Sequence, residues 1–480
     1  MRSYGAIVLL IVASSCATVP EDAGFSDVER VTRERESQRV TWRKGDVDAA
    51  GDDKVRELLA RELDVDGAVQ VALLRHPRLQ AIYEELEISR AALLQTLLPN
   101  NPEVDVGVRI GVPSFTGIEL DASIVGDVTN LLFIPLRAQL AGTQLEVAKL
   151  QVTDAVLAAV AAVKETFARH VAARELLSVQ TTYAIAAEAA AEMAERQLLA
   201  GTEHELFRAT RLAESLEARL RVAEAEVHVI ETREALLRTM GLFGAETALQ
   251  VPQRLRALPT ADVAVADLEA RAVEARVDLA AEQLAVDVAG QRLAFAQPWF
   301  VPFVNAGVEV ERDDKLSVGP RVGFSLPVFD WGQARRMGLE ASKRGAERRV
   351  EALAIDIRSR VRESAARMVA ARARVDFIGS SLLPARQAQL DLSVLHYNRM
   401  MIGVFDLLRA RQDQLDAERD DVLAREAYWV ARAELERAVG GRLPSAVATE
   451  LTSAPDARPS TSSPVVPAAQ PAASSHEGHN

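Results

Sequence analysis

The chain has 480 residues, a net charge of −13, 49% hydrophobic residues and only 5% aromatic residues. This composition favours long helices over a thick globular core. Nucleic-acid binding needs clustered positive charge, whereas here Lys and Arg alternate with Asp and Glu as on solvated helix faces.

The N-terminus predicts export and lipidation. Met1-Arg2 is followed by an apolar run from Ala6 to Ala13, and small residues then precede Cys16. This segment resembles a bacterial lipoprotein signal. We therefore expect residues 1–16 to be the signal and Cys16 the acylated mature N-terminus. Ala13 stands where Leu is usual, so ordinary cleavage after Ala17 is the alternative. Because Cys16 is the only cysteine, no intrachain disulfide is expected.

The remaining elements fall into two similar repeats. Residues 17–60 are predicted to be an extended N-terminal arm, and the first repeat covers 61–250. It contains helices at about 65–97, 132–199 and 203–240, with a strand pair at about 103–127. A linker follows at 251–263. The second repeat, 264–442, has helices at about 265–296, 333–401 and 405–439, with a local break near Pro384 and strands at about 303–311 and 316–328. The halves are offset by about 200 residues, which indicates an internal duplication.

Residues 443–480 form a tail rich in Pro, Ser and Ala that we predict to be disordered. No further run of about 18 apolar residues is present, so no membrane-spanning helix is expected.

The four strand segments alternate apolar and polar residues. Val104-Asp-Val-Gly-Val-Arg-Ile110 is typical, and Val304-Asn-Ala-Gly-Val-Glu-Val310 is its counterpart. Such a strand has one apolar and one polar face, as a strand between lipid and a watery lumen requires. Four strands cannot close a barrel, and an open edge is not tolerated in lipid. The remaining strands must therefore come from other copies of the chain.

Several motifs resemble the TolC-like outer-membrane efflux factor family over about residues 60–442. His76-Pro77-Arg78-Leu79 resembles the family's Asn-Pro-x-Leu opening, and Gly323-Phe-Ser-Leu-Pro-Val-Phe-Asp-Trp-Gly332 resembles its Leu-Pro-Leu-Phe-Asp-x-Gly. The motif residues are Pro77, Leu326, Pro327, Phe329, Asp330 and Gly332. The first repeat departs from the pattern with Leu131-Leu-Phe-Ile-Pro-Leu-Arg137.

The resemblance implies a mainly α-helical homotrimer with membrane β-strands. Four strands per chain would complete a twelve-stranded barrel in the outer membrane of a Gram-negative cell. The helices would continue it as a helical barrel across the periplasm to an adaptor protein and an inner-membrane pump. The lumen would be lined by polar residues of the strands: Asp105, Arg109, Glu119, Asp121, Asn305, Glu309 and Arg321.

The resemblance also implies a periplasmic gate at the helix turns, which here contain Gly201, Gly403 and Asp406. Three copies of Asp406 would form a ring of carboxylates that selects cations. The alternative is an ordinary helix-capping aspartate. Both glycines are predicted to supply a positive φ at a tight turn.

His476 and His479 suggest a divalent metal site in the tail, and with it a metal cargo such as copper; a solvated tail is the alternative. No phosphate loop, zinc-protease motif or nucleophile elbow occurs. We therefore expect neither an enzyme nor a cofactor, but a passive efflux duct. Two alternatives remain: a lipid-anchored periplasmic coiled coil, and the outer-membrane duct of a type I protein secretion system.

Overall fold

The computed structural model describes residues 21–43, 49–110, 118–260, 265, 267–296, 303–312, 315–325 and 328–443. Met1–Leu258 and Ala264–Leu443 form one compact unit, which contains every described helix and strand. Cys16, Leu326, Pro327, His476 and His479 lie outside the described residues, so the predictions for them stay predictions.

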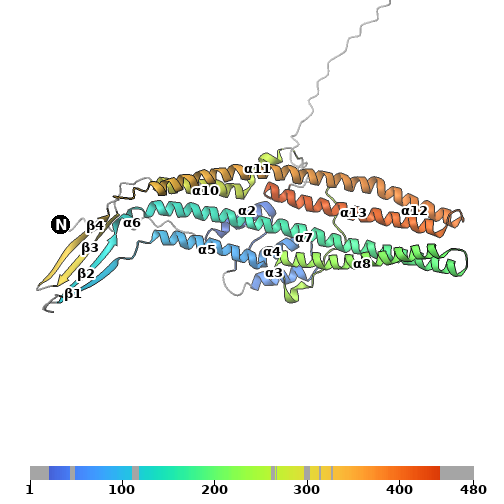
Figure 1. Cartoon of the computed structure of the whole chain (residues 1–480), viewed down its shortest axis with the longest axis horizontal. Coiled ribbons are helices and arrows are strands. Elements are labelled where there is room, and N and C mark those ends of the chain that lie inside the picture. Colours follow the sequence, from blue (N-terminus) through green and yellow to red (C-terminus); the bar gives the residue numbers. More distant parts are fainter. Residues whose placement is uncertain are drawn as a thin grey trace, which may run out of the picture. The chain divides into compact units, whose positions relative to one another are not determined.

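The first repeat contains one helix of 66 residues. Its elements are α4 (Val65–Arg75), α5 (Pro77–Leu97), β1 (Glu103–Ile110), β2 (Ile118–Asp127), α6 (Val128–Leu132), α7 (Ile134–Leu199) and α8 (Glu205–Met240), followed by the 3₁₀ turn η1 (Gly244–Thr247) (Figure 1). α8 packs back along α7, and α5 packs against the first part of α7. A helix this long cannot bury itself and needs such neighbours along its length.

The second repeat has the same order of elements. These are α9 (Leu268–Ala275), α10 (Val277–Phe295), β3 (Phe303–Arg312), β4 (Leu316–Ser325), α11 (Gln333–Phe377), the π turn η2 (Ile378–Leu382), α12 (Leu383–Asn398) and α13 (Val404–Val439). The π turn is the break predicted near Pro384, where proline removes a backbone donor. α7 packs along both α13 and α10, which joins the repeats.

Each repeat opens with two helices where the sequence predicts one. In the first repeat the chain bends at His76, whose ψ is 115°, because the residue before Pro77 is driven out of the helical region. In the second repeat Arg276 has a ψ of 124° without a following proline. Its guanidinium is buried and pairs with Asp278. Leu79 and Leu279, three residues after these two bends, are both buried.

The prediction of an extended arm over residues 17–60 is wrong, because α2 (Phe25–Glu36) and α3 (Ala49–Leu59) lie within it. The ring of Phe25 lies 5.1 Å from that of Tyr83 on α5. At the other end of α2, Glu36 accepts a hydrogen bond of 2.6 Å from Lys164, which also bonds Glu436 at 2.7 Å. Burial raises the pKa of Glu36. The N-terminal segment is therefore fixed to helices of both repeats.

The four strands form one antiparallel sheet in the order β1-β2-β3-β4. Its register places apolar residues beside apolar residues across all strands, as in the row Val104, Ile124, Val308 and Pro320. Among the described residues, no helix has both the length and the apolar character needed to cross a bilayer.

Gly307 allows β2 and β3 to approach closely. A Cβ atom at this position would lie 2.1 Å from the carbonyl oxygen of Ile124, although real Cβ contacts stay beyond 3.0 Å. We expect Gly307→Ala to push the strands apart and destabilise the protein by about 1–3 kcal/mol, as overpacking does. Gly323→Ala is the matched control, because a Cβ there meets nothing within 4 Å. Thermal unfolding in detergent measures both; equal midpoints would contradict the prediction.

His170 is a buried titratable group in the core of the helices. Its Nδ1 lies 3.2 Å from the hydroxyl of Thr232. Burial, and then the nearby charges of Arg174 and Arg233, lower the pKa of His170 to about 4. The unfolded chain therefore binds more protons between pH 6.5 and pH 4, so stability is fully present above the unfolded pKa and falls as the pH drops towards 4.

We expect His170→Gln to reduce the loss of stability at low pH, because glutamine does not titrate and still offers a hydrogen-bond partner to Thr232. At about 1.4 kcal/mol per pKa unit, the native chain should lose about 2–3 kcal/mol more than the variant between about pH 7 and pH 4. Unfolding followed by circular dichroism at several pH values measures this difference. Parallel curves for the two proteins would disprove the assignment.

Candidate functional site

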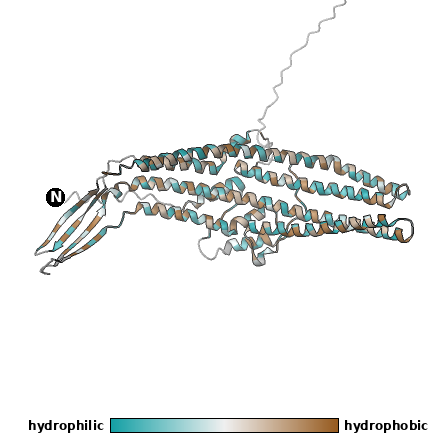
Figure 2. Ribbon diagram, viewed as in Figure 1, coloured by the Kyte–Doolittle hydropathy of each residue, from teal (hydrophilic) through white to brown (hydrophobic). Residues whose placement is uncertain are grey.

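One face of the sheet is apolar and exposed. Val106, Val308, Val318 and Val322 expose 51–69% of their surface, and Phe324 exposes 64%. In Figure 2 the strands carry apolar and polar residues in alternation. A contiguous exposed apolar surface of this kind marks an interaction site. Because it lies on a sheet with satisfied internal hydrogen bonds, the surface suits contact with lipid.

The opposite face carries the residues predicted to line the lumen. Asp105, Asp121, Asn305, Glu309 and Arg321 all occupy this face by strand alternation. A guanidinium nitrogen of Arg321 lies 3.8 Å from a carboxylate oxygen of Glu309 and 3.5 Å from the hydroxyl of Ser123. Arg109 and Glu119 stand opposite each other in the register, and their side chains lie outside what the structure describes.

The strand-to-helix motif of the second repeat contains a turn that is held by a side-chain hydrogen bond. Asp330 accepts a hydrogen bond of 2.8 Å from the amide of Gly332, which has a φ of 75° and directly precedes α11. In the first repeat Asp127 accepts one of 2.9 Å from the amide of Asn130 at the start of α6. An aspartate therefore accepts a backbone amide between sheet and helix in both repeats, but only Asp127 is a helix N-cap, because the N-cap of α11 is Gly332, without a side-chain cap bond. Pro77 is the first residue of α5, and Phe329 exposes 94% of its surface.

The helix turns of the two repeats have the same C-terminal cap. Amides of Gly201 and Thr202 donate to the carbonyls of Leu198 and Gln197. Amides of Met400 and Met401 donate to the corresponding carbonyls of Tyr397 and His396. This is a Schellman cap, in which one residue takes a positive φ. That residue is Gly201, with a φ of 73°, in the first turn and Met400, with a φ of 59°, in the second.

The prediction of a positive φ at Gly403 is therefore wrong. Gly403 has a φ of −81° and is the N-cap of α13, so its counterpart is His204, the N-cap of α8. Nδ1 of His204 accepts a hydrogen bond of 3.1 Å from the amide of Phe207. Gly403 has no side chain for this purpose. The side chain of Asp406 instead accepts a hydrogen bond of 3.0 Å from the amide of Gly403. Asp406 therefore caps the start of α13.

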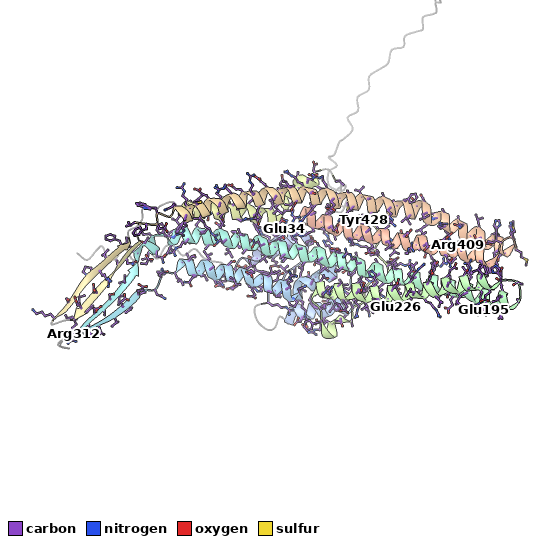
Figure 3. All side chains as sticks on the ribbon, in the orientation of Figure 1. Glu34, Glu195, Glu226, Arg312, Arg409 and Tyr428 are labelled. Carbon is purple, nitrogen blue, oxygen red and sulfur yellow. The ribbon has the colours of Figure 1, made fainter. Side chains whose placement is uncertain are left out.

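An aromatic cluster joins the two turns. The rings of Phe207 on α8 and Phe405 on α13 lie edge to face, with centroids 4.8 Å apart. The guanidinium carbon of Arg211 lies 5.3 Å from the first centroid and 5.4 Å from the second. We call Phe207, Arg211 and Phe405 the latch. The turns lie at the end of the helices remote from the sheet (Figure 1), and Figure 3 labels Glu195 and Arg409 near them.

The sequence contains only a weak signal for the latch. Phe207 and Arg211 are four residues apart, so they share one face of a helix. Phe405 lies between Gly403 and Asp406. Their contact depends on how α8 and α13 pack, which no spacing in the chain specifies.

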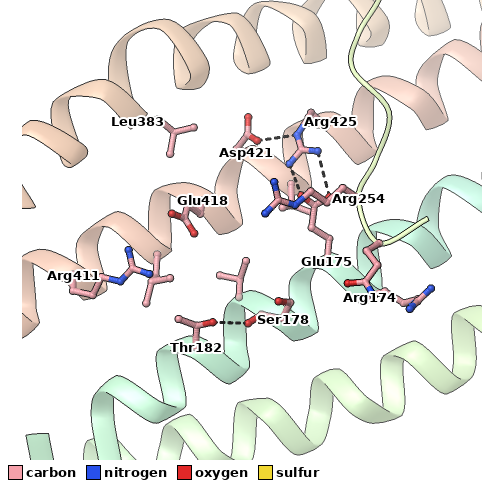
Figure 4. A pocket seen from close by; sticks show the side chains of 14 residues that line it. Arg174, Glu175, Ser178, Thr182, Arg254, Leu383, Arg411, Glu418, Asp421 and Arg425 are labelled. Atoms are coloured by element: carbon pink, nitrogen blue, oxygen red, sulfur yellow. Dashed lines mark hydrogen bonds and ion pairs between the residues drawn. The ribbon is translucent and has the colours of Figure 1, made fainter. Parts of the chain in front are cut away.

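A polar cavity of about 440 Å³ lies among α7, α13, the start of α12 and the linker at residues 253–254 (Figure 4). Arg425 on α13 crosses it, with bonds of 2.9 Å to Glu175 and 2.8 Å to Asp421. Arg174 donates to the carbonyl of Val251 at 2.7 Å. These charges pair with each other and with the backbone, so they connect α7, α13 and the linker. Within the described residues, no group of three or more His, Cys, Asp and Glu side chains is arranged to hold a metal ion.

The chain thus combines a sheet that has one exposed apolar face with paired long helices. The model of the outer membrane efflux protein family matches residues 245–441. The second repeat of the chain therefore resembles this family. Comparison of the sequence with curated proteins gives no match.

Solved structures of outer-membrane proteins have a similar fold. CmeC of Campylobacter jejuni is 15% identical, with a TM-score of 0.68 over 80% of this chain and 86% of its own. VceC of Vibrio cholerae is 14% identical, with a TM-score of 0.64 over 79% of this chain and 96% of its own. MtrE of Neisseria gonorrhoeae is 17% identical, with a TM-score of 0.63 over 78% of this chain and 89% of its own.

Proposed function

We propose that this protein is the outer-membrane exit duct of a tripartite efflux system. Three copies would form a twelve-stranded barrel that conducts substrates passively to the cell exterior. The observation that carries the proposal is the sheet, with its exposed apolar face, its charged opposite face and its two open edges. A soluble coiled-coil protein has no use for an exposed apolar sheet face, which would promote aggregation.

The topology of the sheet favours closure by identical copies. β1 and β4 are its edges, and they run antiparallel because the four strands alternate in direction. β4 of one copy can therefore pair with β1 of the next in the same antiparallel manner as within the chain. Three copies give an even number of strands and leave no free edge in the lipid.

The helices and their turns would form the periplasmic part of the duct. The turns would meet a periplasmic adaptor protein and an inner-membrane pump, and the pump would supply the energy. The latch would hold the turns of each copy together and keep this end closed. The ring of three Asp406 carboxylates remains part of the proposal, although one oxygen of each is engaged in capping.

The proposal also includes Cys16, His476 and His479, which lie outside the described ranges. Acylation of Cys16 would anchor the mature N-terminus in the outer membrane. His476 and His479 would bind a divalent metal and favour a metal cargo such as copper, with drugs as the alternative cargo. Alanine at both histidines should lower metal tolerance if the pair serves transport, and unchanged tolerance would mean that the pair does not contribute.

The proposed function is tested by fractionation and conductance. The protein should be recovered from the outer-membrane fraction as a trimer, and purified trimers in planar bilayers should conduct ions. A Cys16→Ala variant exported by an ordinary signal peptide should still insert. A protein that stays soluble once the anchor is removed would overturn the duct and favour the periplasmic coiled coil.

A further inference from the structure

Exposed apolar side chains gather where the strands join the helices. They come from three of the four junctions and are Leu98, Leu131, Leu132, Phe329, Trp331 and Met337, each 50–94% exposed. We call these residues the junction belt. Its residues lie in or next to the segments that connect the strands to α5, α7 and α11, and Figure 1 shows these helices at one end of the sheet. Aromatic side chains at this level are typical of the boundary between acyl chains and headgroups.

A positive patch follows the junction belt on α11. Residues 335–349 contain six basic and two acidic side chains, a net charge of +4 in a chain of net charge −13. Arg336 pairs with Glu340, and Lys343 pairs with Glu347. Arg335 and Arg344 are exposed and have no ion pair or side-chain hydrogen bond to any described residue.

The order of these groups along the chain matches the order of layers at a membrane surface. Trp331 and Phe329 belong to the junction belt, and Arg335 lies in the first turn of α11 directly after it. Arg344 follows about 14 Å further along the helix at about 1.5 Å per residue. Charge attraction extends over about 8–10 Å at physiological ionic strength, and long arginine side chains reach towards the interface. Both guanidinium groups are therefore close enough to attract phosphates that lie beside the junction belt.

We propose that the junction between β4 and α11 binds the headgroups of anionic phospholipids in the periplasmic leaflet of the outer membrane. Trp331 and Phe329 occupy the acyl boundary, and Arg335 and Arg344 attract the phosphates. The inference rests on the proposed barrel and adds a specific lipid partner to it. Each basic residue near an anionic surface contributes enough attraction to enrich anionic lipid about fivefold.

The test uses the full chain reconstituted in phosphatidylcholine bilayers with trace spin-labelled phosphatidylglycerol or phosphatidylcholine. Electron paramagnetic resonance measures the relative association of the two labels with the protein. At low ionic strength we expect phosphatidylglycerol to be preferred about fivefold or more. Arg335→Gln with Arg344→Gln should reduce this preference to near unity.

Arg358→Gln with Arg360→Gln is the matched control. Both arginines are exposed on the same helix and likewise have no ion pair to a described residue, and the change in charge is identical. They lie more than about 30 Å beyond Arg335 at about 1.5 Å per residue, so the lipid preference should be unchanged. Equal loss in both double variants would overturn the proposal, as would the absence of any preference in the native protein.

Two further measurements separate this inference from its alternatives. Inorganic phosphate should reduce the preference no more than sodium chloride of equal ionic strength, and a larger effect would indicate a free-phosphate site and overturn the lipid assignment. The Arg335→Gln, Arg344→Gln trimer should conduct in planar bilayers like the native trimer. Native protein that fails to insert or conduct would overturn the proposed duct itself, whereas normal conductance without lipid preference would overturn only the lipid site.

Discussion

Val308→Arg is expected to prevent the protein from accumulating as a trimer in the outer membrane. Val308 lies near the middle of β3 on the apolar face, between Ile124 and Pro320 of the neighbouring strands. An arginine at the lipid-facing midplane of a barrel costs about 2–4 kcal/mol. Each trimer would carry three such residues, so the total penalty of about 6–12 kcal/mol is comparable to the stability of a domain.

Asn305→Arg is the control for this experiment. Asn305 lies on the same strand but on the polar face, so the same side chain would project into the watery lumen of the proposed barrel. We expect this variant to form trimers at the native level and to change only ion selectivity. Membrane fractionation followed by electrophoresis without heating measures the trimer. If both arginine variants assemble equally well, the assignment of the two faces is wrong.

Arg211→Ala and Phe405→Ala are expected to raise the conductance of purified trimers. The edge-to-face ring pair is worth about 0.5–1.5 kcal/mol and the cation–π contacts about 0.5–1 kcal/mol. Phe405→Ala therefore weakens the closed arrangement by about 1–2.5 kcal/mol per copy, and Arg211→Ala by about 0.5–1 kcal/mol per copy. If the three copies open together, the closed state loses about 3–7 kcal/mol in Phe405→Ala and about 1.5–3 kcal/mol in Arg211→Ala, so the first variant should conduct more than the second.

Arg221→Ala tests whether the position of the contact matters. The guanidinium of Arg221 lies 5.8 Å from the ring centroid of Tyr183, but this pair joins α7 and α8 within one helical hairpin. Its removal should leave the conductance at the native level. Single-channel recording in planar bilayers measures all three variants. Native conductance in Arg211→Ala would show that the latch does not restrain the duct.

The sequence predicts the strands and the long helices well, because these elements follow from patterns of neighbouring residues along the chain. Alternation over Val104–Ile110 and Val304–Val310 specifies a strand with two unlike faces, and the structure has strands there. The bend at His76 could be foreseen from Pro77. The bend at Arg276 could not, because it follows from a buried pair with Asp278 and from packing that the second repeat shares with the first.

The candidate gate was also predicted only in part. Gly201 is a glycine at a helix end, and its positive φ follows from that pattern. In the second turn the pattern is misleading: Met400 takes the positive φ, and Gly403 lies at the start of the next helix. A non-glycine residue in that conformation costs about 1 kcal/mol and is held there by the surrounding turn.

The alternating hairpins, the duplication and the resemblance to efflux channels were determined by the sequence alone, because periodicity and repeated motifs are properties of the chain. The tertiary structure decided the register that makes the apolar face continuous and the fixing of α2 to both repeats by Lys164. It also decided the contact between Phe207 and Phe405, which lie in different repeats. These features depend on which distant elements pack together. The free energy of that packing is shared among many residues, so no single local pattern in the sequence specifies it.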